Sequence, residues 1–479
     1  MSICFVSNKH FTIALSATAR RLAARGERIV WLSPSKRWAR WLEREGWNPE
    51  SILDVSDFGH EWRDPPPVEQ SREALGDLET APYPTIANVV RMCRSLRDQP
   101  PARALAYLAA CRRRVEPFLR AHAVEIVFGE ATWGFEMLVW LTSRRLGIPM
   151  LCPSTTRIPG DRFFFPDALH SALVPFRESS DDDRAWADGY LDVWRNRPVQ
   201  PAYATLNRRG YRMFHRRWLE EIGIGLFRSE LDRGDETLWS LRDRVADRIR
   251  RAWNAWRYRV ARPWTGTPAG ERYVLYCLHH QPEAAVDVFG SLHSDQVALI
   301  DRLSRILPAT HTLWVKEHPA AIGDRSIPWY RAIARRSNVR LVDPFAPIYA
   351  FVQGADAVVT ISGTVGYEAA LLGKPVFGLA PLYFAELFAA PTRHDIDPLA
   401  WNLHAALRDD GAKVPARSQL VDFLARLKAN SFPGDPARIA WTEDDRRSTD
   451  YMRMEADGYM TVILGMRRER LDNPGTAPE

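Results

Sequence analysis

The regular alternation of short apolar runs and helical segments between Tyr273 and Leu379 constrains the fold more than any other feature of the sequence. Each apolar run is four to six residues long, as expected of a strand that is buried on both faces of a sheet. Because short loops join the runs to segments with helical spacing, the pattern predicts a doubly wound parallel sheet. The predicted strands are 273–278, 312–316, 339–342, 357–360 and 375–379.

The N-terminal part of the chain opens with the same pattern. Ile3–Ser7 is an apolar run, and Phe11–Ala24 has helical spacing. Gly26 stands where a helix C-cap belongs, and further strands are predicted at Arg28–Leu32 and Glu125–Gly129. The fold class that we expect is therefore α/β, with two Rossmann-like doubly wound domains and a helical insertion between them.

The helical insertion, residues 180–265, is rich in arginine and tryptophan. An exposed insertion with internal ion pairs fits this composition, and so does a basic amphipathic surface that docks on a membrane. Nucleic-acid binding fits less well, because no known nucleic-acid module is present. The Pro/Gly-rich segment 263–270 predicts a domain boundary. We expect domains at 1–179 and 266–440, a helical tail at 441–479, and an irregular, proline-rich insertion at 57–98.

The composition is that of a globular protein. Of the 479 residues, 46% are hydrophobic and 26% charged, and this length exceeds what one compact core accommodates. The five cysteines are scattered without a CxxC pair, which favours free thiols in a reducing cytoplasm over a metal site. The N-terminus lacks the pattern of a secretory signal, and no apolar run approaches the 18 residues or so of a membrane span. The formal charge of +6 decides little alone.

The strongest functional signal is the segment Val358–Val376. An apolar run ends in Ser362, Gly363 and Thr364, and a helix is predicted to follow. Unpaired N–H groups and the helix dipole make such a helix start an anion site, and it could also be a simple strand–helix turn. Glu368 is predicted to lie in the first helical turn, where it could accept hydrogen bonds from ribose hydroxyls.

Two more polar groups follow predicted strands of the second domain. Lys316 is the last residue of the strand at 312–316, and His318 follows two residues later. Both could face an anion. His280, Gln281 and Glu283 follow the strand at 273–278. Because ligands of open α/β sheets bind at the carboxyl ends of the strands, we expect these side chains near a sugar or a phosphate.

Polar residues also follow the strands of the first domain. Glu130 comes directly after an apolar run and could act as a general base on an acceptor hydroxyl, or be an acidic residue at a helix start. Asn8 follows the first strand, and Arg157 and Arg162 lie in a loop that could hold an anionic acceptor. We expect Glu130 to face the second domain across a cleft.

The dipeptides Gln281-Pro282 and His318-Pro319, together with SGTVGYEAALLGKPV at 362–376, resemble the capsule polysaccharide biosynthesis family. That family includes bacterial Kdo transferases of capsule assembly, which have a GT-B fold. The resemblance is clearest over 273–382, and in the first domain it rests mainly on Gly129-Glu130. The sequence differs from the family pattern at Glu317, where the family often has a basic or polar residue. It also differs in the proline-rich and Arg/Trp-rich segments.

The resemblance implies roles for these residues. His318 and Ser362–Thr364 would hold the donor phosphate, Glu368 would hold the ribose, and Gln281 and its neighbours would lie near the sugar. Lys316 joins the candidate donor-binding residues because of its place at the end of a predicted strand. The candidate catalytic residues are Glu130, His280, Gln281 and Glu283, and the candidate acceptor-binding residues are Asn8, Arg157 and Arg162.

The expected activity is transfer of a sugar, with Kdo or a related acidic sugar as a candidate. The donor would be a nucleotide sugar, CMP-linked in that case, and the acceptor a surface polysaccharide or a lipid-linked saccharide. No cofactor or metal ion is expected, and the place of action would be the cytoplasm, at the inner face of the membrane if the Arg/Trp-rich segment docks there. The alternatives are a nucleotide-sugar 2-epimerase and a non-catalytic glycan-binding or scaffold protein.

Overall fold

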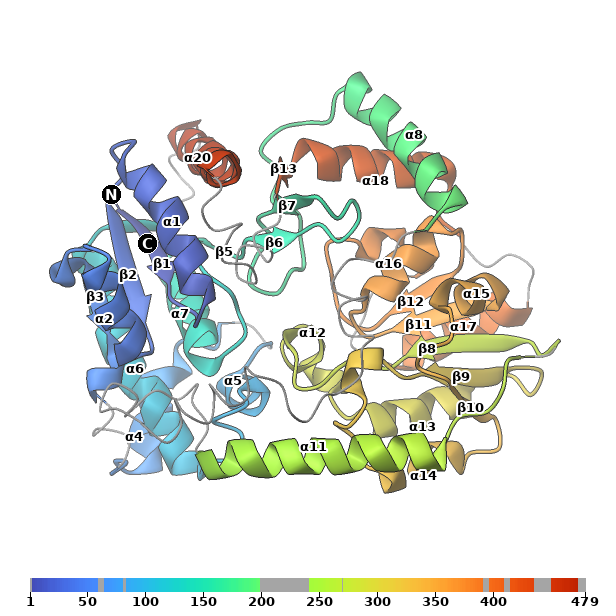
Figure 1. Ribbon diagram of the computed structural model, residues 1–479. Helices are drawn as coiled ribbons and strands as arrows, with labels where there is room; N and C mark the ends of the chain where they lie inside the picture. The colour runs from blue at the N-terminus through green and yellow to red at the C-terminus, as the bar shows by residue number, and fades with distance from the viewer. Residues whose placement is uncertain are drawn as a thin grey trace. The chain divides into compact units, whose positions relative to one another are not determined.

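The structure of the protein is a computed structural model that describes residues 2–58, 64–80, 83–198, 241–268, 270–390, 396–408, 414–434 and 449–472. Among these residues, contacts define two units (Figure 1). Unit 1 comprises the described residues up to Glu178 and from Asn430 onward, and unit 2 those from Ser179 to Ala429. Each unit contains a five-stranded sheet, and each is described by itself.

The main sheet of unit 1 is parallel and has the strand order β3-β2-β1-β4-β5. In β1, β2 and β4 every residue is buried, which explains why the sequence shows apolar runs there and no polar alternation. The prediction of a Rossmann-like sheet is confirmed. The strands are β1 (Ser2–Val6), β2 (Ile29–Ser33), β3 (Ile52–Asp54), β4 (Val124–Phe128) and β5 (Met150–Leu151).

The helices before the tail of unit 1 are α1 (Phe11–Ala23), α2 (Lys36–Arg44), α4 (Val68–Gly76), α5 (Ile86–Met92), α6 (Pro101–Ala121) and α7 (Gly134–Arg145). The prediction that residues 57–98 are irregular was wrong for α4 and α5. Thr85 and Asn88 form a capping box that starts α5, and Leu75 and Val89 are buried. Packing therefore stabilises two short helices that the proline-rich composition conceals.

The chain returns to unit 1 at its C-terminal end. A small antiparallel sheet joins β6 (Ser154–Thr155) and β7 (Arg162–Phe164) to β13 (Phe432–Pro433). Helix α20 (Thr449–Asp472) corresponds to the helix expected in the tail, and it packs against α1. Its Tyr459 is fully buried, with its ring centroid 4.7 Å from that of Phe128 on β4.

The sheet of unit 2 is parallel and has the order β10-β9-β8-β11-β12, the same pattern as in unit 1. All five strands predicted for this region are present. They are β8 (Tyr273–Cys277), β9 (Thr312–Lys316), β10 (Val339–Val342), β11 (Ala357–Thr360) and β12 (Val376–Gly378). The α/β fold class is therefore confirmed for both units.

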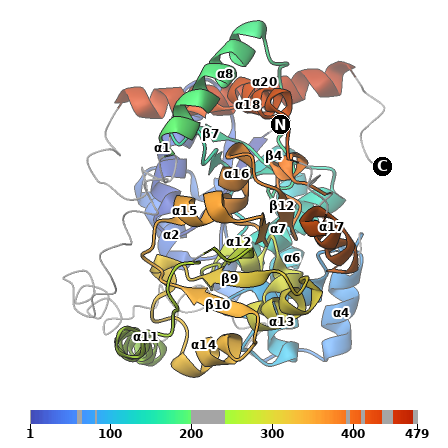
Figure 2. The ribbon, with the colours of Figure 1, turned by 90° about the vertical axis from the view of Figure 1, so that its right-hand side faces the viewer.

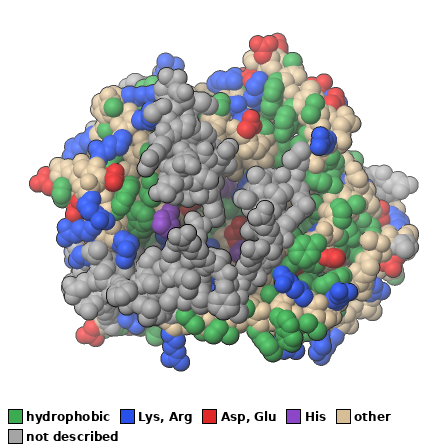
Figure 3. Space-filling view, viewed as in Figure 1, with side chains coloured by type: hydrophobic (Ala, Val, Ile, Leu, Met, Phe, Trp, Pro, Cys, Tyr) green, Lys and Arg blue, Asp and Glu red, His purple; other side chains and the backbone are tan. Residues whose placement is uncertain are grey.

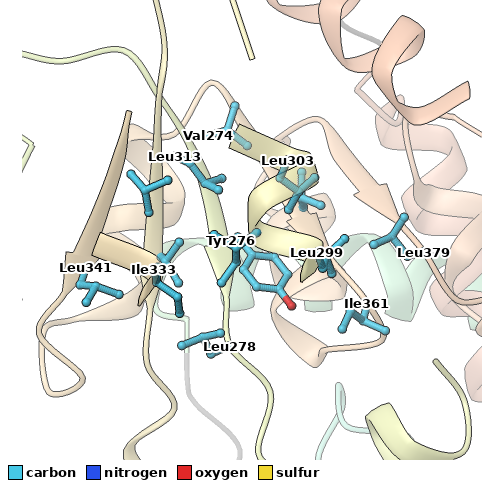
Figure 4. Packing of buried hydrophobic residues seen from close by; sticks show 14 of the residues in the cluster. Val274, Tyr276, Leu278, Leu299, Leu303, Leu313, Ile333, Leu341, Ile361 and Leu379 are labelled. Carbon is cyan, nitrogen blue, oxygen red and sulfur yellow. The ribbon is translucent and has the colours of Figure 1, made fainter. Parts of the chain in front are cut away.

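Helices cover both faces of this sheet, with α13 and α14 on one side and α15 and α16 on the other (Figures 1 and 2). On one face, Tyr276 and Leu313 of the sheet pack with Leu299 and Leu303 of α13 (Figure 4). The helices are α8 (Asp181–Asn196), α11 (Leu241–Ala261), α12 (Ala284–Asp287), α13 (Gln296–Ile306), α14 (Ile327–Ala334), α15 (Ile348–Gly354), α16 (Thr364–Leu371), α17 (Ile396–Arg408) and α18 (Arg417–Ala429).

Two helices of the expected insertion 180–265 are described, and both belong to unit 2; residues 199–240 lie outside the described part. Helix α8 packs against α18, where Arg417 forms ion pairs with Asp188 and Asp192 (Figure 2). Helix α11 precedes the Pro/Gly-rich segment 263–270, and β8 follows it. In the described residues, no helix has the length and hydropathy that a membrane span requires.

Candidate functional site

The carboxyl edge of the unit 2 sheet contains a topological switch point. Strands β8 and β11 are neighbours in the sheet, and the connections that leave them lead to helices on opposite faces. In open α/β sheets such a point leaves a crevice where ligands bind. The loop after β8 contains residues 278–283 and the loop after β11 contains residues 361–363, so two of the predicted motifs meet here.

His279 joins these two loops. Its Nε2 accepts a hydrogen bond from the Ser362 backbone N–H at 3.2 Å and lies 3.3 Å from Thr360 Oγ1. Burial, followed by the charges of His318 and Arg325, lowers the pKa of His279 to about 3, so the ring is neutral. His279 is not among the candidate residues predicted from the sequence. It stands beside His280 after the same strand, and only its burial in the fold distinguishes the two histidines.

The start of α16 is partly satisfied within the protein. The Ser362 N–H is bonded to His279, the Gly363 N–H donates to Thr360 Oγ1 at 2.9 Å, and Ser362 Oγ donates to the Ala285 carbonyl. A Cβ on Gly363 would lie 3.1 Å from His279 Nε2. Gly363 therefore allows the two loops to approach each other, and the positive end of the α16 dipole lies at this edge.

Glu368 is buried, with 6% of its surface exposed. Helix α16 begins at Thr364, so Glu368 lies in the second turn, and its predicted place in the first turn was wrong. Burial raises the pKa of its carboxyl to about 8. Burial, with a smaller contribution from the charge of Glu368, also raises the pKa of Cys277 at the end of β8. Within the described residues, no hydrogen bond compensates the buried carboxyl group, which makes it a receptive partner for a ligand hydroxyl.

Glu317, where the sequence departs from the family pattern, forms a buried ion pair. Its Oε1 and Oε2 lie 2.7 and 2.8 Å from Arg325 Nη1, and Tyr330 donates to Oε2 at 2.7 Å. Arg325 also donates to the His279 carbonyl. The acidic residue before His-Pro is thus a structural anchor that ties the end of β9 to the loop after β8.

Lys316 is also used by the fold. Its buried Nζ donates to the Pro344 carbonyl at 2.6 Å and to the Asp343 carbonyl at 3.4 Å. His318 is half-buried, and its Nδ1 accepts a hydrogen bond from the Ala320 N–H at 3.1 Å. Burial lowers the pKa of His318, so the ring is neutral near pH 7 and Nε2 carries its proton.

His280 and Glu283 lie beside His318. The rings of His280 and His318 have centroids 6.3 Å apart, and Glu283 Oε2 lies 3.9 Å from His280 Nδ1. His280 Nε2 lies 2.9 Å from Asp324 Oδ2, and Asp324 also pairs with Arg251 of α11 at 2.6 Å. The structure thus gathers three predicted residues around one edge of the sheet.

Gln281 has a positioning role. Its Nε2 donates to the Ser294 carbonyl at 2.9 Å and to Asp287 Oδ1 at 3.3 Å. Its Oε1 accepts from Gln296 Nε2 at 2.6 Å. Because both ends of the amide bind the protein, Gln281 holds the loop in place.

Unit 1 contains a second group of polar residues at the switch point between β1 and β4. Asn8 Nδ2 donates to Glu130 Oε2 at 2.5 Å and to Thr132 Oγ1 at 3.1 Å, and Thr132 donates to Glu136 Oε2 at 2.9 Å. Burial raises the pKa of Glu130 to about 7, opposed by its Asn8 hydrogen bond and by Arg94. Burial and then the charge of Glu130 raise the pKa of Glu136 to about 8. Both carboxyl groups therefore have raised pKa values.

A small hollow open to solvent adjoins this group through Asn8 and Glu136. Its lining comes from the segments after β1, β2 and β4: Ser7, Asn8, Lys9, Pro34, Ser35, Trp38, Trp133 and Glu136. The buried hydroxyl of Ser35 has no hydrogen-bond partner in the described part of the chain. Two tryptophans and an uncompensated hydroxyl suit a partly polar ligand.

The two arginines predicted to bind an acceptor do not line this hollow. Arg162 Nε donates to Ser431 Oγ at 2.8 Å, and its guanidinium also binds the Ser431 carbonyl. Arg162 thus fastens β7 to the returning C-terminal segment. Arg157 has a left-handed backbone with φ of 67°. Burial, followed by the charge of Arg157, lowers the pKa of His170 to about 3.

Comparison with known proteins identifies one family. The sequence model of the capsule polysaccharide biosynthesis protein family matches residues 244–386, from α11 to the loop after β12, which confirms the predicted resemblance. No curated protein sequence matches the chain.

Solved structures give more distant matches. One is the beta Kdo 2,4 transferase KpsC of Thermosulfurimonas dismutans, with 13% identity, a TM-score of 0.34, and coverage of 63% of this chain and 79% of that one. A second is a putative UDP-N-acetylglucosamine 2-epimerase of Listeria monocytogenes, with 11% identity, a TM-score of 0.26, and coverage of 92% and 93%. Scores this low support no argument about function.

Proposed function

We propose, from the match of residues 244–386 to the capsule polysaccharide biosynthesis family, that this protein is a glycosyltransferase of surface-polysaccharide assembly with a GT-B arrangement. The donor is a nucleotide sugar, for which CMP-linked Kdo or a related acidic sugar is the first candidate. The acceptor is a saccharide or a lipid-linked saccharide, and the reaction takes place in the cytoplasm, at the inner face of the membrane. Its chemistry requires no metal ion.

The observation that carries the proposal is the group of polar residues at the switch point of unit 2, inside the matched segment. His318 Nε2–H and the positive end of α16 are donors suited to a phosphate group. Glu368 offers a buried acceptor for ribose hydroxyls. His280 and Glu283, which lie beside His318, would contact the sugar, while Lys316 and Gln281 keep the surrounding loops in position.

In unit 1 the proposed general base is Glu130. A base is most effective when its pKa lies near the working pH, and burial raises the pKa of Glu130 to about 7. Asn8 orients the carboxylate, and Trp38 and Trp133 offer flat apolar surfaces for a sugar ring. The acceptor would occupy this hollow, with its hydroxyl near Asn8 and the Glu130 carboxyl group that Asn8 binds.

The experiment that tests the proposal measures nucleotide binding first. Thermal unfolding is followed with CMP, UDP and GDP, and one of the three should raise the unfolding temperature. His318→Ala should remove that shift, whereas His404→Ala on α17, outside the switch point, should retain it. The absence of a response to every nucleotide would contradict the proposed donor site.

Transfer is tested with the responding nucleotide's sugar and an acceptor saccharide. Glu130→Gln should lower kcat by about 10²- to 10⁴-fold while nucleotide binding is kept, because it removes proton transfer alone. Release of an epimer or a free sugar without an acceptor would contradict the transfer reaction. Full turnover by both His318→Ala and Glu130→Gln would overturn the site assignment.

A further inference from the structure

One face of helix α11 packs against the core of unit 2. Ala255 and Tyr258 are buried in the core, and the Tyr258 ring centroid lies 4.7 Å from that of Tyr330 on α14. Asn254 Nδ2 donates to the Gly323 carbonyl at 3.2 Å. A Cβ on Gly323 would lie 2.6 Å from the Arg251 carbonyl oxygen, so glycine is required for this close approach. The helix is therefore a fixed part of the unit.

The opposite face of α11 presents apolar side chains to solvent. Ile249, Trp253, Trp256 and Val260 are exposed by 62%, 56%, 55% and 66%. Their spacing of four, three and four residues places them in one line along the helix, which we call the outer stripe. The two tryptophan rings pack on each other with centroids 5.0 Å apart. An exposed apolar line of this kind usually marks a contact surface.

Arginines border the outer stripe on both sides. Arg257 follows Trp256 and Arg259 precedes Val260, so at about 100° per residue the two arginines project to opposite flanks. Both are exposed, and neither has a hydrogen bond or ion pair with the described residues. The sequence from Arg248 to Arg262 contains six arginines and no acidic residue.

Asp247, the acidic residue directly before this segment, does not neutralise this surface. Asp247 accepts a hydrogen bond from Arg251 at 2.8 Å, on the side of the helix that contacts unit 2. Figure 3 shows hydrophobic and basic side chains next to one another along the lower edge of the view, where α11 runs in Figure 1. The outer face of α11 is therefore both apolar and positively charged.

We propose that α11 docks the protein on an anionic lipid bilayer. The outer stripe enters the interface between headgroups and acyl chains, where tryptophan is favoured, and the flanking arginines bind lipid phosphates. Charge on both flanks of a single exposed helix matches a flat anionic surface parallel to the helix axis. Ile249 and Val260 offer no flat ring to a nucleic-acid base, which disfavours a single-stranded nucleic acid as the occupant. This inference rests on the proposed function, which locates the protein at a membrane, and it identifies α11 as the surface that contacts the membrane.

The test uses the full-length protein and sedimentation with vesicles of pure phosphatidylcholine or of phosphatidylcholine with 30% phosphatidylglycerol, roughly the anionic content that creates a negative surface potential. The wild type should bind the anionic vesicles and lose binding in high salt. Arg257→Gln with Arg259→Gln should weaken binding on the order of 30-fold, because each arginine near the surface contributes roughly a factor of five. Trp253→Ser with Trp256→Ser should weaken it at least as much.

Matched controls lie outside α11. Trp401→Ser removes a tryptophan on α17 that is 80% exposed, and Arg302→Gln with Arg305→Gln removes two exposed charges on α13; both should bind like the wild type.

Failure of the wild type to bind anionic vesicles, or wild-type binding by the Trp253/Trp256 variant, would overturn the proposal. A dimer that the tryptophan variant converts to a monomer, or salt-sensitive binding of single-stranded nucleic acid in place of vesicles, would also overturn it. Nucleotide binding is measured on every variant, so loss of docking is distinguished from loss of the donor site.

Discussion

At the scale of single residues, burial decides which of the polar side chains remain available to a ligand. Lys316, Gln281 and Arg162 looked like binding residues in the sequence, yet each donates to nearby carbonyl oxygens. The carboxyl group of Glu368, by contrast, has no hydrogen-bond partner among the described residues. The sequence revealed the residue types and their strands, whereas their hydrogen-bond partners depend on contacts between distant segments.

Glu368 gives a prediction about pH. Its carboxyl has a pKa of about 8 without ligand, and two hydroxyl donors would stabilise the carboxylate, so nucleotide binding should release a proton. The affinity for nucleotide should therefore rise as the pH increases from 6 to about 8 and level off above it. Isothermal titration calorimetry at several pH values, in buffers of different ionisation enthalpy, measures both the affinity and the proton release. Glu368→Gln should abolish the pH dependence, and an equal dependence in this variant would exclude Glu368 as its source.

At the scale of elements, α16 is placed by close packing against β11. Gly366 lies in the first turn of α16, and a Cβ there would lie 2.7 Å from Thr360 Cγ2, which is fully buried. Glycines at a helix start can also let a phosphate approach the backbone closely. The structure shows that Gly366 serves the contact between helix and strand, a role that sequence alone does not separate from ligand binding.

Gly366→Ala should therefore lower the free energy of unfolding by about 1–3 kcal/mol, because the added methyl group forces α16 away from the sheet. Gly76→Ala is the matched control, since Gly76 ends α4 and no atom lies within 4 Å of its Cβ position. That control should change stability by less than about 1 kcal/mol. Urea unfolding of both variants provides the comparison, and equal stability of the two would contradict the packing argument.

A second element-scale feature is the double use of Asp324. It pairs with Arg251 of α11 and lies 2.9 Å from His280 Nε2, so one carboxylate contacts both the proposed docking helix and the loop after β8. No sequence motif points to this connection, because Asp324 stands in a loop without a recognisable pattern around it.

At the scale of the whole molecule, the sequence predicted two Rossmann-like sheets, because buried parallel strands leave apolar runs that are visible without any structure. It did not predict that the small sheet of unit 1 takes β13 from beyond unit 2. A two-residue strand such as Phe432–Pro433 has no periodicity to recognise, and its pairing with β7 depends on tertiary contacts alone.

The contribution of α20 to unit 1 can be measured through Tyr459. Its ring packs against Phe128 and Phe165 at centroid distances of 4.7 Å each. Tyr459→Ala should destabilise unit 1 by about 3–5 kcal/mol, as expected for loss of a buried aromatic ring. Hydrogen exchange should show faster exchange of the β1 and β4 amides and unchanged exchange of β8 and β9, which belong to unit 2.

The control for this prediction is Leu464→Ala, on the same helix but 50% exposed, which should leave exchange almost unchanged. Uniform protection loss in both units after Tyr459→Ala would show that the two units unfold together and would contradict a local effect.

The return of the chain to unit 1 has a consequence for biosynthesis. A ribosome makes β1 to β5 before unit 2 and α20 after it, so the apolar face around Phe128 and Phe165 stays uncovered while all of unit 2 is translated. Nascent chains with exposed apolar surface are prone to aggregation and are the usual clients of chaperones. Unit 1 therefore completes its core only after unit 2 has been made, although its parallel sheet is made before unit 2.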